Sequence, residues 1–357
     1  MSKSSLHVGI LTGGGDCPGL NAVIRGVTNS LIKTVGARVT GIERGFMGMI
    51  ERRSRPLDSE AVAGILNQGG TILGTHNFAN PFSCNGVDVS DKVMEYVREL
   101  GLDALVAIGG DGTMSIANRF TPLGLPVVGV PKTIDNDLMH TERPFGFDSA
   151  VAIVAEALAR LETTARSHGR VMVLETMGRY AGWIALEGGL AGGADVILIP
   201  EKPYDLNEVI RVCKEREKKQ GYTLICIAEG ARPIDGGMVV AKHLENSPDP
   251  IRLGGVGNVL RQQLEQHLES EVRTTQLGHV QRGGTPTPYD RVLATRFGWY
   301  AAKMVANGEF GRMVVLKGDE CASVPIEDVA NRTRNVPENH SLLDVATSLG
   351  VSLGLPA

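Results

Sequence analysis

Two polar clusters in the sequence could carry out chemistry on phosphate groups, and each follows a run of apolar residues. The first is the Gly-Gly-Asp-Gly-Thr turn at residues 109–113, after the apolar run 104–108. The second is the loop 132–137, after the apolar run 126–130. Such runs are typical of buried parallel strands, and open α/β sheets bind their ligands at the carboxyl ends of strands. We therefore expect the functional site at these two turns.

The turn at residues 109–113 has the properties of a phosphate-binding turn. Gly109, Gly110 and Gly112 let backbone N–H groups approach an anion closely, and the N-terminus of the following helix adds a favourable field. Asp111 would repel a phosphate, and a Mg²⁺ ion shared by the carboxylate and the phosphate oxygens removes that conflict. Glycine-rich turns also end many strands that bind nothing, so the turn alone leaves both possibilities open.

The loop after the second apolar run places two carboxylates beside a cation and a hydroxyl group. Asp135 and Asp137 are two positions apart, close to Lys132 and Thr133. This set suits one carboxylate as a proton acceptor and the other as a metal ligand or orienting group. A solvated pair of loop carboxylates is the alternative.

The triple-glycine turn Gly13–Gly15 is a further candidate for binding an anion. It follows an apolar strand-like run and precedes a stretch with apolar residues at helical spacing. The turn lacks the Gly-Lys-Ser/Thr of a P-loop and does not match the dinucleotide fingerprint. A tight turn that serves helix packing is the alternative.

Cationic side chains near the ends of later strands could hold a phosphorylated substrate. Arg179 follows a strand-like run and can direct its guanidinium group toward a ligand at the sheet edge. Arg273, His279 and Arg282 lie close together in the sequence and could clamp phosphate oxygens. The alternatives are a structural ion pair between Arg179 and Glu229, and a solvated basic face.

Strand-like runs alternate with helical patterns along the chain. This alternation predicts an α/β protein with two doubly wound lobes, mainly parallel sheets, and an active site in the cleft between the lobes. The strongest helical periodicity is at 146–167, and the polar segment 231–254 is expected to be a surface loop or insertion. We expect one larger lobe at 1–145, a second at 146–310, and a segment at 311–357 that crosses back to the first lobe without carrying chemistry. Further elements are expected as strands at 7–12, 104–108, 126–130, 171–174, 196–199, 223–228 and 313–316, a strand and loop at 37–50, a short helix closed by 64–82, and helices at 90–100, from 257 to 269, from 290 and after 326.

Composition excludes several classes of protein. The chain has 357 residues and a formal net charge of -4, which argues against binding to nucleic acid or to a membrane surface. Its five scattered cysteines include no Cys-x-x-Cys pair, so we expect reduced thiols. No apolar run approaches the length of a membrane span and the N-terminus has no signal-like segment, so we expect a cytoplasmic protein.

Five motifs together resemble the 6-phosphofructokinases, in the same order and at similar separations. The resemblance extends over residues 7–315. The motifs are LTGGGDCPGLNAVIRG, IGGDGT, VPKTIDND, ETMGRYAGWIAL and LGHVQRGGTPTPYDR.

The resemblance implies phosphoryl transfer from MgATP to the 1-hydroxyl group of fructose 6-phosphate, the glycolytic step that gives fructose 1,6-bisphosphate. Asp135 would be the general base and Asp111 the Mg²⁺ ligand. The first lobe would bind the nucleotide and the second lobe the sugar phosphate. Arg170 and Arg273 match positions that in this family reach into a neighbouring subunit's site, which implies a homodimer or homotetramer.

The resemblance also assigns the remaining site residues. The further catalytic residues are Thr133, Lys132, Asp137 and Arg179. The residues expected to bind the nucleotide are Gly15, Asn77, Phe78, Gly110, Asp111, Gly112 and Thr113. The residues expected to bind fructose 6-phosphate are Thr133, Ile134, Asp135, Arg170, Met177, Gly178, Arg179, Glu229, Arg273, His279, Val280, Gln281 and Arg282.

The phosphoryl donor is indicated by two positions that point in different directions. Family members that use pyrophosphate usually carry Asp where this chain has Gly112, and they carry Lys where this chain has Lys132. Glycine leaves room and removes negative charge next to the α-phosphate of a nucleotide, whereas lysine can neutralise phosphate with either donor. ATP is therefore favoured, and pyrophosphate is the alternative.

Some positions depart from the family pattern. Asn77 stands where many relatives carry an arginine that contacts the transferred phosphate, and Lys132 could replace that cation. Asn29 and Glu162 stand where effector-binding cations are expected, which argues against the usual allosteric effectors. Two other interpretations are a lipid or NAD kinase, which shares the GGDGT turn but not the later motifs, and a catalytically silent subunit.

Overall fold

The computed structural model describes residues 6–243 and 251–356, with the backbone alone for 240–243 and 251–253. The described chain forms two compact units, each assembled from three stretches. Unit 1 comprises 1–134, 138–148 and 282–333, and unit 2 comprises 135–137, 149–281 and 334–357.

The units divide the chain differently from the expected ranges 1–145, 146–310 and 311–357. Residues 282–333 join unit 1, because a helix at 288–307 packs against the first helix and a strand at 312–317 extends the unit 1 sheet. Residues 334–357 belong to unit 2, so the end of the chain does not return to unit 1.

Unit 1 is built on a mainly parallel sheet whose strand order is β14-β13-β5-β4-β1-β2-β3, with β6 paired to β5. The pairs from β2 to β13 are parallel, and the edge strands β3 and β14 are antiparallel. Its elements are β1 (His7–Thr12), α1 (Leu20–Ser30), β2 (Arg38–Ile42), α2 (Phe46–Glu51), β3 (Ser54–Leu57), α3 (Ser90–Leu100), β4 (Ala104–Gly109), α4 (Asp111–Phe120), β5 (Val127–Thr133), β6 (Phe145–Gly146), α9 (Pro288–Asn307), β13 (Arg312–Lys317) and β14 (Glu320–Pro325).

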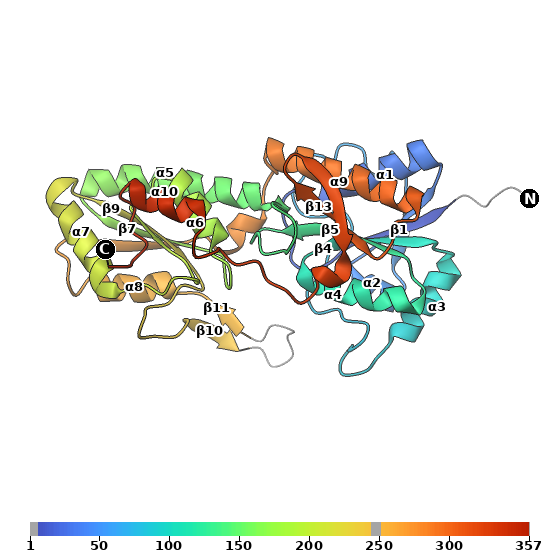
Figure 1. Cartoon of the computed structure of the whole chain (residues 1–357), viewed down its shortest axis with the longest axis horizontal. Helices are drawn as coiled ribbons and strands as arrows, with labels where there is room; N and C mark the ends of the chain where they lie inside the picture. Colours follow the sequence, from blue (N-terminus) through green and yellow to red (C-terminus); the bar gives the residue numbers. More distant parts are fainter. Residues whose placement is uncertain (1–5, 244–250, 357) are drawn as a thin grey trace, which may run out of the picture. The chain divides into compact units, whose positions relative to one another are not determined.

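The centre of this sheet is buried on both faces, which explains the continuous apolar runs in the sequence. Every residue of β1, β4 and β5 is buried. Helices α2, α3 and α4 cover one face, and α1 and α9 lie side by side over the other (Figure 1). The close approach of α1 and α9 depends on Gly26 and Gly298, since a Cβ atom on Gly298 would lie 2.7 Å from the carbonyl oxygen of Val23.

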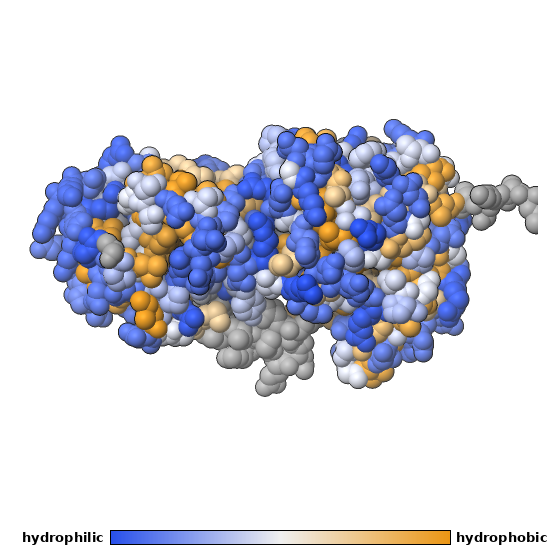
Figure 2. Space-filling model, viewed as in Figure 1, coloured by the Kyte–Doolittle hydropathy of each residue, from blue (hydrophilic) through white to orange (hydrophobic). Residues whose placement is uncertain are grey.

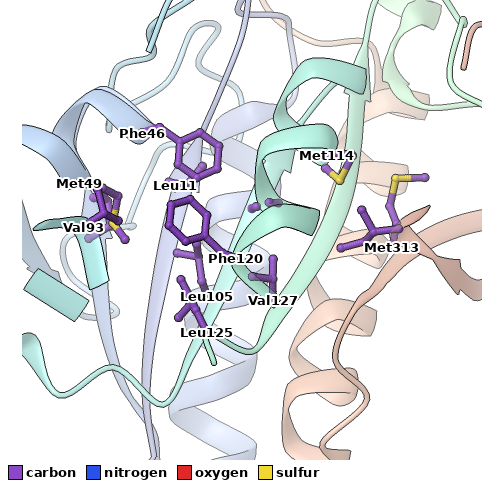
Figure 3. Close-up of a cluster of buried hydrophobic side chains, with 14 of the residues drawn as sticks. Leu11, Phe46, Met49, Val93, Leu105, Met114, Phe120, Leu125, Val127 and Met313 are labelled. Atoms are coloured by element: carbon purple, nitrogen blue, oxygen red, sulfur yellow. The ribbon is translucent and has the colours of Figure 1, made fainter. Parts of the chain in front are cut away.

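The core beneath α4 is an aromatic and aliphatic cluster. Phe46 and Phe120 stack with ring centroids 6.0 Å apart, and they lie in one cluster with Leu11 of β1 and Leu105 of β4 (Figure 3). Phe120 is the last residue of α4 and is fully buried. The packing therefore fixes the helix whose first turn carries the glycine-rich residues 110–113.

Helix α9 begins at a well-defined cap. The hydroxyl group of Thr287 accepts a hydrogen bond from the backbone N–H of Asp290 (3.2 Å) and donates one to Asp148 (2.7 Å), and Pro288 occupies the first helical position. Gly308, at φ 73°, ends the helix in the left-handed conformation. These residues fix the chain directly after the LGHVQRGG motif.

Unit 2 is built on a four-stranded parallel sheet in the order β12-β7-β9-β8. Helices α7 and α8 pack on one face of this sheet, and α5 packs on the other. The elements of the unit are α5 (Phe147–His168, whose first two residues belong to unit 1), β7 (Val171–Thr176), α6 (Trp183–Ala191), β8 (Val196–Leu198), α7 (Leu206–Lys219), β9 (Thr223–Ala228), β10 (Val240–His243), β11 (Ile251–Leu253), α8 (Val256–Leu264), β12 (Val272–Gln276) and α10 (Ser341–Ser348).

The predicted fold class, an α/β protein with two doubly wound units and mainly parallel sheets, is confirmed. The predicted position of an active site between the units stays a prediction. The strands expected at 104–108, 171–174 and 223–228 and the helix expected at 90–100 are present.

The segment 231–254, predicted as a surface loop or insertion, contains an antiparallel strand pair, β10 and β11. Two local predictions were wrong. The short helix that was predicted to end at the passage 64–82 is absent, and the chain forms turns there. A short helix, α2, occupies part of the predicted loop at 37–50. Short elements of this kind depend on tertiary packing more than on local periodicity.

The outer surface is mainly polar. Figure 2 shows hydrophilic residues over most of the visible face of each unit, with hydrophobic residues in small groups. Within the described ranges, no helix is both long enough and apolar enough to cross a bilayer. All five cysteines are free thiols, as predicted.

The Phe120 cluster gives the first prediction. Replacing Phe120 with Ala removes a fully buried ring and leaves a cavity under α4, so we expect the free energy of unfolding to fall by about 3–5 kcal/mol. Urea unfolding followed by circular dichroism measures this loss. Leu123→Ala, at a nearby position that is 45% exposed, is the control and should change the free energy by less than about 0.5 kcal/mol. Equal effects of the two substitutions would contradict the assigned core.

Candidate active site

Two glycine-rich turns meet at the carboxyl edge of the unit 1 sheet. Strands β1 and β4 are parallel neighbours, and the backbone N–H of Gly13 donates to the carbonyl oxygen of Ile108 (2.9 Å). The buried side chain of Thr113 fills the space between the turns, because a Cβ atom on Gly13 would lie 2.6 Å from its hydroxyl oxygen. Glycine is thus required for close packing of the two turns, and Gly14, at φ 74°, also has a left-handed backbone.

Two cations lie against the triple-glycine turn. Lys132, at the end of β5, is only 4% exposed, and its ammonium group donates to the carbonyl oxygen of Gly15. Arg282 donates to the carbonyl oxygen of Asp16 (3.2 Å), and its Nη1 atom lies 2.6 Å from the place of a Cβ atom on Gly15. The turn therefore combines partly exposed backbone at Gly14 and Gly15 with an ammonium group and a guanidinium group, which suits a phosphate chain. Arg282, which was predicted with the sugar phosphate, lies here in unit 1.

Asp111 opens α4 and is held by a distant part of the chain. Its Oδ1 accepts a hydrogen bond from the backbone N–H of Asn331 (2.6 Å), and the amide oxygen of Asn331 accepts one from Ser115 (3.2 Å). Burial raises the pKa of Asp111 above its ordinary value, although the backbone N–H groups of Asn331 and Arg332 oppose the shift. A partly desolvated carboxylate at a helix N-terminus is suited to a cation that arrives with a phosphate.

Asp111 is the carboxylate that the sequence predicted as a metal ligand. In the part of the chain that the structure describes, no three His, Cys, Asp or Glu side chains gather closely enough to hold a metal ion. A Mg²⁺ ion here would therefore have Asp111 as its carboxylate ligand and take its other oxygens from phosphate and water, which is usual for Mg²⁺ in phosphoryl transfer. The donor set fits the predicted ion.

The neighbouring residue, Gly112, faces open space. It is exposed, its φ lies outside the left-handed region, and no atom lies within 4 Å of the place of its Cβ. The room beside Asp111 that a nucleotide would need is therefore present in unit 1.

Asn77 and Phe78, which were predicted to contact the nucleotide, follow a segment fixed to β1. Thr75 donates to the carbonyl oxygen of Gly14 (2.5 Å), and Thr12 donates to that of Gly74 (2.8 Å). Asn77 is exposed and Phe78 is 46% exposed. The structure thus places both side chains just beyond the triple-glycine turn, on the surface of unit 1.

In unit 2, three adjacent strands bring the predicted sugar-phosphate residues to one sheet edge. The N–H of Glu229, after β9, donates to the carbonyl oxygen of Thr176 (2.8 Å), and the N–H of Leu277, after β12, donates to that of Glu175 (3.0 Å). Met177–Arg179 and His279–Gln281 follow these contacts directly. The side chains of His279 and Val280 are exposed, whereas Gln281 is fully buried.

The buried carboxylate of Glu175 stabilises this sheet edge through hydrogen bonds. The sequence did not reveal this role. Glu175 is 1% exposed and accepts hydrogen bonds from the N–H groups of Gly255 (2.9 Å) and Gly257 (2.8 Å) and from the amide of Gln276 (2.7 Å). It therefore joins the end of β7, the end of β12 and the start of α8. A lone acid inside the ETMGR motif gave no signal of this role.

The loop that carries the proposed general base begins in unit 1 and continues in unit 2. Thr133 and Ile134 belong to unit 1 and are buried, while Asp135–Asp137 belong to unit 2. Asp135 follows the last residue of β5 by two positions, and β5 is the parallel neighbour of β4, which precedes Asp111. The backbone N–H of Arg334 donates to the carbonyl oxygen of Asp137 (2.7 Å).

Arg170 and Arg273 lie at the opposite end of the unit 2 sheet from Met177–Arg179. Both arginines pair with Glu271, and the Nε of Arg170 lies 2.5 Å from its carboxylate. Arg170 precedes β7 and Met177 follows it, so the six-residue strand separates them by roughly 20 Å. Within one chain, these arginines do not join the set at the carboxyl edge.

The C-terminal residues were expected to carry no chemistry, but two of them contact candidate site residues or their loop. Asn331 binds Asp111 and Arg334 binds the loop after the proposed base. Neither residue lies in an apolar repeat or a recognisable motif, so no sequence pattern could have indicated these contacts.

The raised pKa of Asp111 predicts a gain of stability when its charge is removed. A group whose pKa is raised on folding destabilises the folded protein while ionised, and protonation at lower pH relieves this cost. Asp111→Asn keeps an oxygen for the N–H of Asn331, so in magnesium-free buffer we expect a higher Tm at about pH 7.5 and a smaller gain at about pH 5.

Asp91→Asn is the matched control, because Asp91 also lies in the first turn of a helix but is exposed. Differential scanning calorimetry of the three proteins at both pH values makes the comparison. A lower Tm for Asp111→Asn at the higher pH, or a gain that does not change with pH, would contradict the burial of this charge.

Comparisons with known proteins identify the family of this chain. The family model "Phosphofructokinase" matches residues 7–305. The chain is 50% identical to "ATP-dependent 6-phosphofructokinase 2" of Clostridium perfringens, over 99% of each chain, and 49% identical to "Pyrophosphate--fructose 6-phosphate 1-phosphotransferase" of Streptomyces coelicolor, over 93% of this chain and 96% of that one. The structure of phosphofructokinase from Saccharomyces cerevisiae is similar with a TM-score of 0.78 at 29% identity, over 90% of this chain and 45% of that one. The predicted family is therefore confirmed, and this chain belongs to the phosphofructokinase family.

Proposed function

We propose that this chain transfers the terminal phosphoryl group of ATP to the 1-hydroxyl group of fructose 6-phosphate, giving fructose 1,6-bisphosphate in cytoplasmic glycolysis. One observation carries the proposal: the metal-binding candidate Asp111 and the base candidate Asp135 follow the parallel neighbours β4 and β5. Parallel neighbours release their chains at the same sheet edge, as a reaction between a metal-bound phosphate and a deprotonated hydroxyl group requires.

The nucleotide phosphates would bind at the two glycine-rich turns of unit 1. Backbone N–H groups of Gly110–Thr113 and of the turn at Gly15 would face the phosphate oxygens, with Lys132 and Arg282 supplying positive charge. Asn77 and Phe78 are exposed just beyond the triple-glycine turn and would contact the rest of the nucleotide. Asp111 would hold Mg²⁺, which when bound supplies charge that offsets the negative charge of the transferred group.

Asp135 would accept the proton of the sugar 1-hydroxyl group. General base catalysis requires a carboxylate within hydrogen-bond reach of that proton, and Thr133 and Asp137 flank it in the sequence. Lys132 and Arg179 would stabilise charge on the transferred phosphoryl group, since the barrier to phosphoryl transfer is lowered mainly by positioning and by cations.

The sugar phosphate would bind at the carboxyl edge of the unit 2 sheet. The backbone contacts after β7, β9 and β12 hold the loops of Met177–Arg179, Glu229 and His279–Gln281 together. Gly178 has φ 126°, a conformation that a side chain would strain, so the chain can turn sharply in front of Arg179. Arginine suits phosphate because its planar fork binds two oxygens at once.

Arg170 and Arg273 would complete the site of a neighbouring subunit, which makes the active enzyme a homodimer or homotetramer. Their position at the amino-terminal end of β7 and β12 supports this proposal, because they lie about a full strand length from the sugar-phosphate edge of their own chain. Glu271 neutralises both side chains in the single chain.

ATP is the proposed donor, and pyrophosphate is the second candidate. The open space at Gly112 favours a donor with an α-phosphate, whereas Lys132 is present in the manner of pyrophosphate enzymes. Relatives of both kinds are about equally similar to this chain, so overall identity does not separate the donors. The steric argument at Gly112 favours ATP.

Replacing Asp135 with Ser tests the proposed base. We expect kcat to fall by about 10²- to 10⁴-fold, because the hydroxyl group cannot accept the proton effectively, while fructose 6-phosphate still binds. A coupled aldolase assay measures turnover, and isothermal titration calorimetry measures sugar-phosphate binding. Asp235→Ser, on an exposed turn, is the control. Normal turnover in Asp135→Ser would exclude Asp135 as the base.

Replacing Gly112 with Asp tests the donor. The new side chain has room and an allowed backbone, so the variant should fold normally and lose at least about tenfold in kcat/KM for ATP through repulsion of the α-phosphate. Rates with ATP and with pyrophosphate are measured side by side for wild type and variant. The wild-type protein should react faster with ATP than with pyrophosphate. A faster reaction with pyrophosphate would contradict the assignment of ATP as the donor.

Gly237→Asp is the matched control, since it adds the same charge at another exposed glycine with open space around its Cβ position. It should leave both rates unchanged. Equal ATP rates for wild type and Gly112→Asp would show that the space beside Gly112 does not receive the α-phosphate.

A further inference from the structure

We propose that Arg334 is a positioning residue that fixes the direction of Asp135 by holding the two residues after it. The inference deepens the function proposed above and rests on it, because it takes Asp135 as the general base. Arg334 lies beyond the residues matched by the family model and outside all five sequence motifs.

Arg334 binds both residues that follow Asp135, and all of these contacts lie within unit 2. Its backbone N–H donates to the carbonyl oxygen of Asp137 (2.7 Å). Its guanidinium Nη1 donates to the side-chain oxygen of Asn136 (3.0 Å). Arg334 thus holds the loop after Asp135 through two hydrogen bonds, one from its main chain and one from its side chain.

One of the two residues that Arg334 binds, Asn136, has an unusual backbone conformation. Asn136 has φ 53°, in the left-handed region that few residues other than glycine adopt, and it is only 2% exposed. Such a conformation persists only where surrounding contacts determine it. Because Asp135 is joined directly to Asn136, a change of the Asn136 backbone would turn the Asp135 carboxylate away from its proton donor.

Arg334 is itself held against a buried aromatic ring. Its guanidinium group lies 4.6 Å from the centre of the Trp183 ring, and the Trp183 indole N–H donates to the carbonyl oxygen of Arg334 (3.0 Å). Trp183 is 1% exposed and is the first residue of α6, shortly after the proposed phosphate ligand Arg179. The planar guanidinium group suits this stacked position, and the ammonium group of lysine does not reproduce it.

The chain directly after Arg334 is fastened to the start of the same helix. Glu201 accepts hydrogen bonds from the N–H of Val336 (2.8 Å) and from the N–H of Gly182 (3.0 Å). The side chain of Asn335 donates to the carbonyl oxygen of Tyr180. Arg334 therefore reaches the base loop from a fixed support, as a residue that sets catalytic geometry must.

The test uses Arg334→Met, which keeps the length of the side chain and the backbone N–H but removes the guanidinium group. We expect kcat to fall by about 10- to 100-fold with little change in KM for ATP, because displacement of a catalytic group by about 1 Å has effects of this size. Arg334→Lys should recover only part of the loss. Calorimetry shows independently whether Arg334→Met folds. If it does not fold, Arg334→Lys still tests the proposal.

Epistasis separates positioning from a general structural role. Asn136→Gly removes the side-chain acceptor and tolerates φ 53°, so the double variant with Arg334→Met should be hardly worse than either single variant. In the Asp135→Ser background, Arg334→Met should have no further effect on kcat. Independent, multiplying losses in either pair, or a wild-type kcat in Arg334→Met, would overturn the proposal.

Arg166→Met is the matched control, because Arg166 also lies over an aromatic ring, 5.5 Å from the centre of Tyr222, but is exposed and contacts no part of the base loop. It should keep the wild-type kcat. A normal kcat in Asp135→Ser would refute the base assignment, whereas a large loss in Asp135→Ser with none in Arg334→Met would refute only the positioning role.

Discussion

The parallel pairing of β4 and β5 is the constraint on which the candidate site depends. Each strand is wholly buried and is followed by polar residues, and because the strands are parallel their chains leave the sheet at the same edge. Asp111 and Lys132 are brought to one edge by this pairing. Without it, the polar residues that follow the two strands would not leave the sheet at the same edge.

Opposite charges at this edge solve a problem that phosphate creates. A partly buried carboxylate such as Asp111 would repel a phosphate chain, and its burial, which raises its pKa, already disfavours its charge. The ammonium group of Lys132 and the guanidinium group of Arg282 lie at the adjacent turn of unit 1. The unit therefore contains both the cations that would bind phosphate and the carboxylate that would hold its metal ion.

The predictable parts of this protein are those encoded by short-range patterns. Buried strands such as Ala104–Gly109 appear as apolar runs, and glycine-rich turns appear as fixed spacings, so the sheets and the Asp111 turn could be predicted. The placement of Arg282 in unit 1 and the return of residues 334–357 to unit 2 could not, because both follow from long-range packing. The contacts of Glu175 and Arg334 could not be predicted either, because they are hydrogen bonds between segments that lie far apart in the sequence.

A crystal structure with Mg²⁺, a non-hydrolysable ATP analogue and fructose 6-phosphate bound together is the most direct test of this account. We expect the metal ion on the carboxylate of Asp111 and the sugar 1-hydroxyl group within about 2.6–3.2 Å of the carboxylate of Asp135. A metal ion bound away from Asp111, or a 1-hydroxyl group that faces some other side chain, would contradict the account.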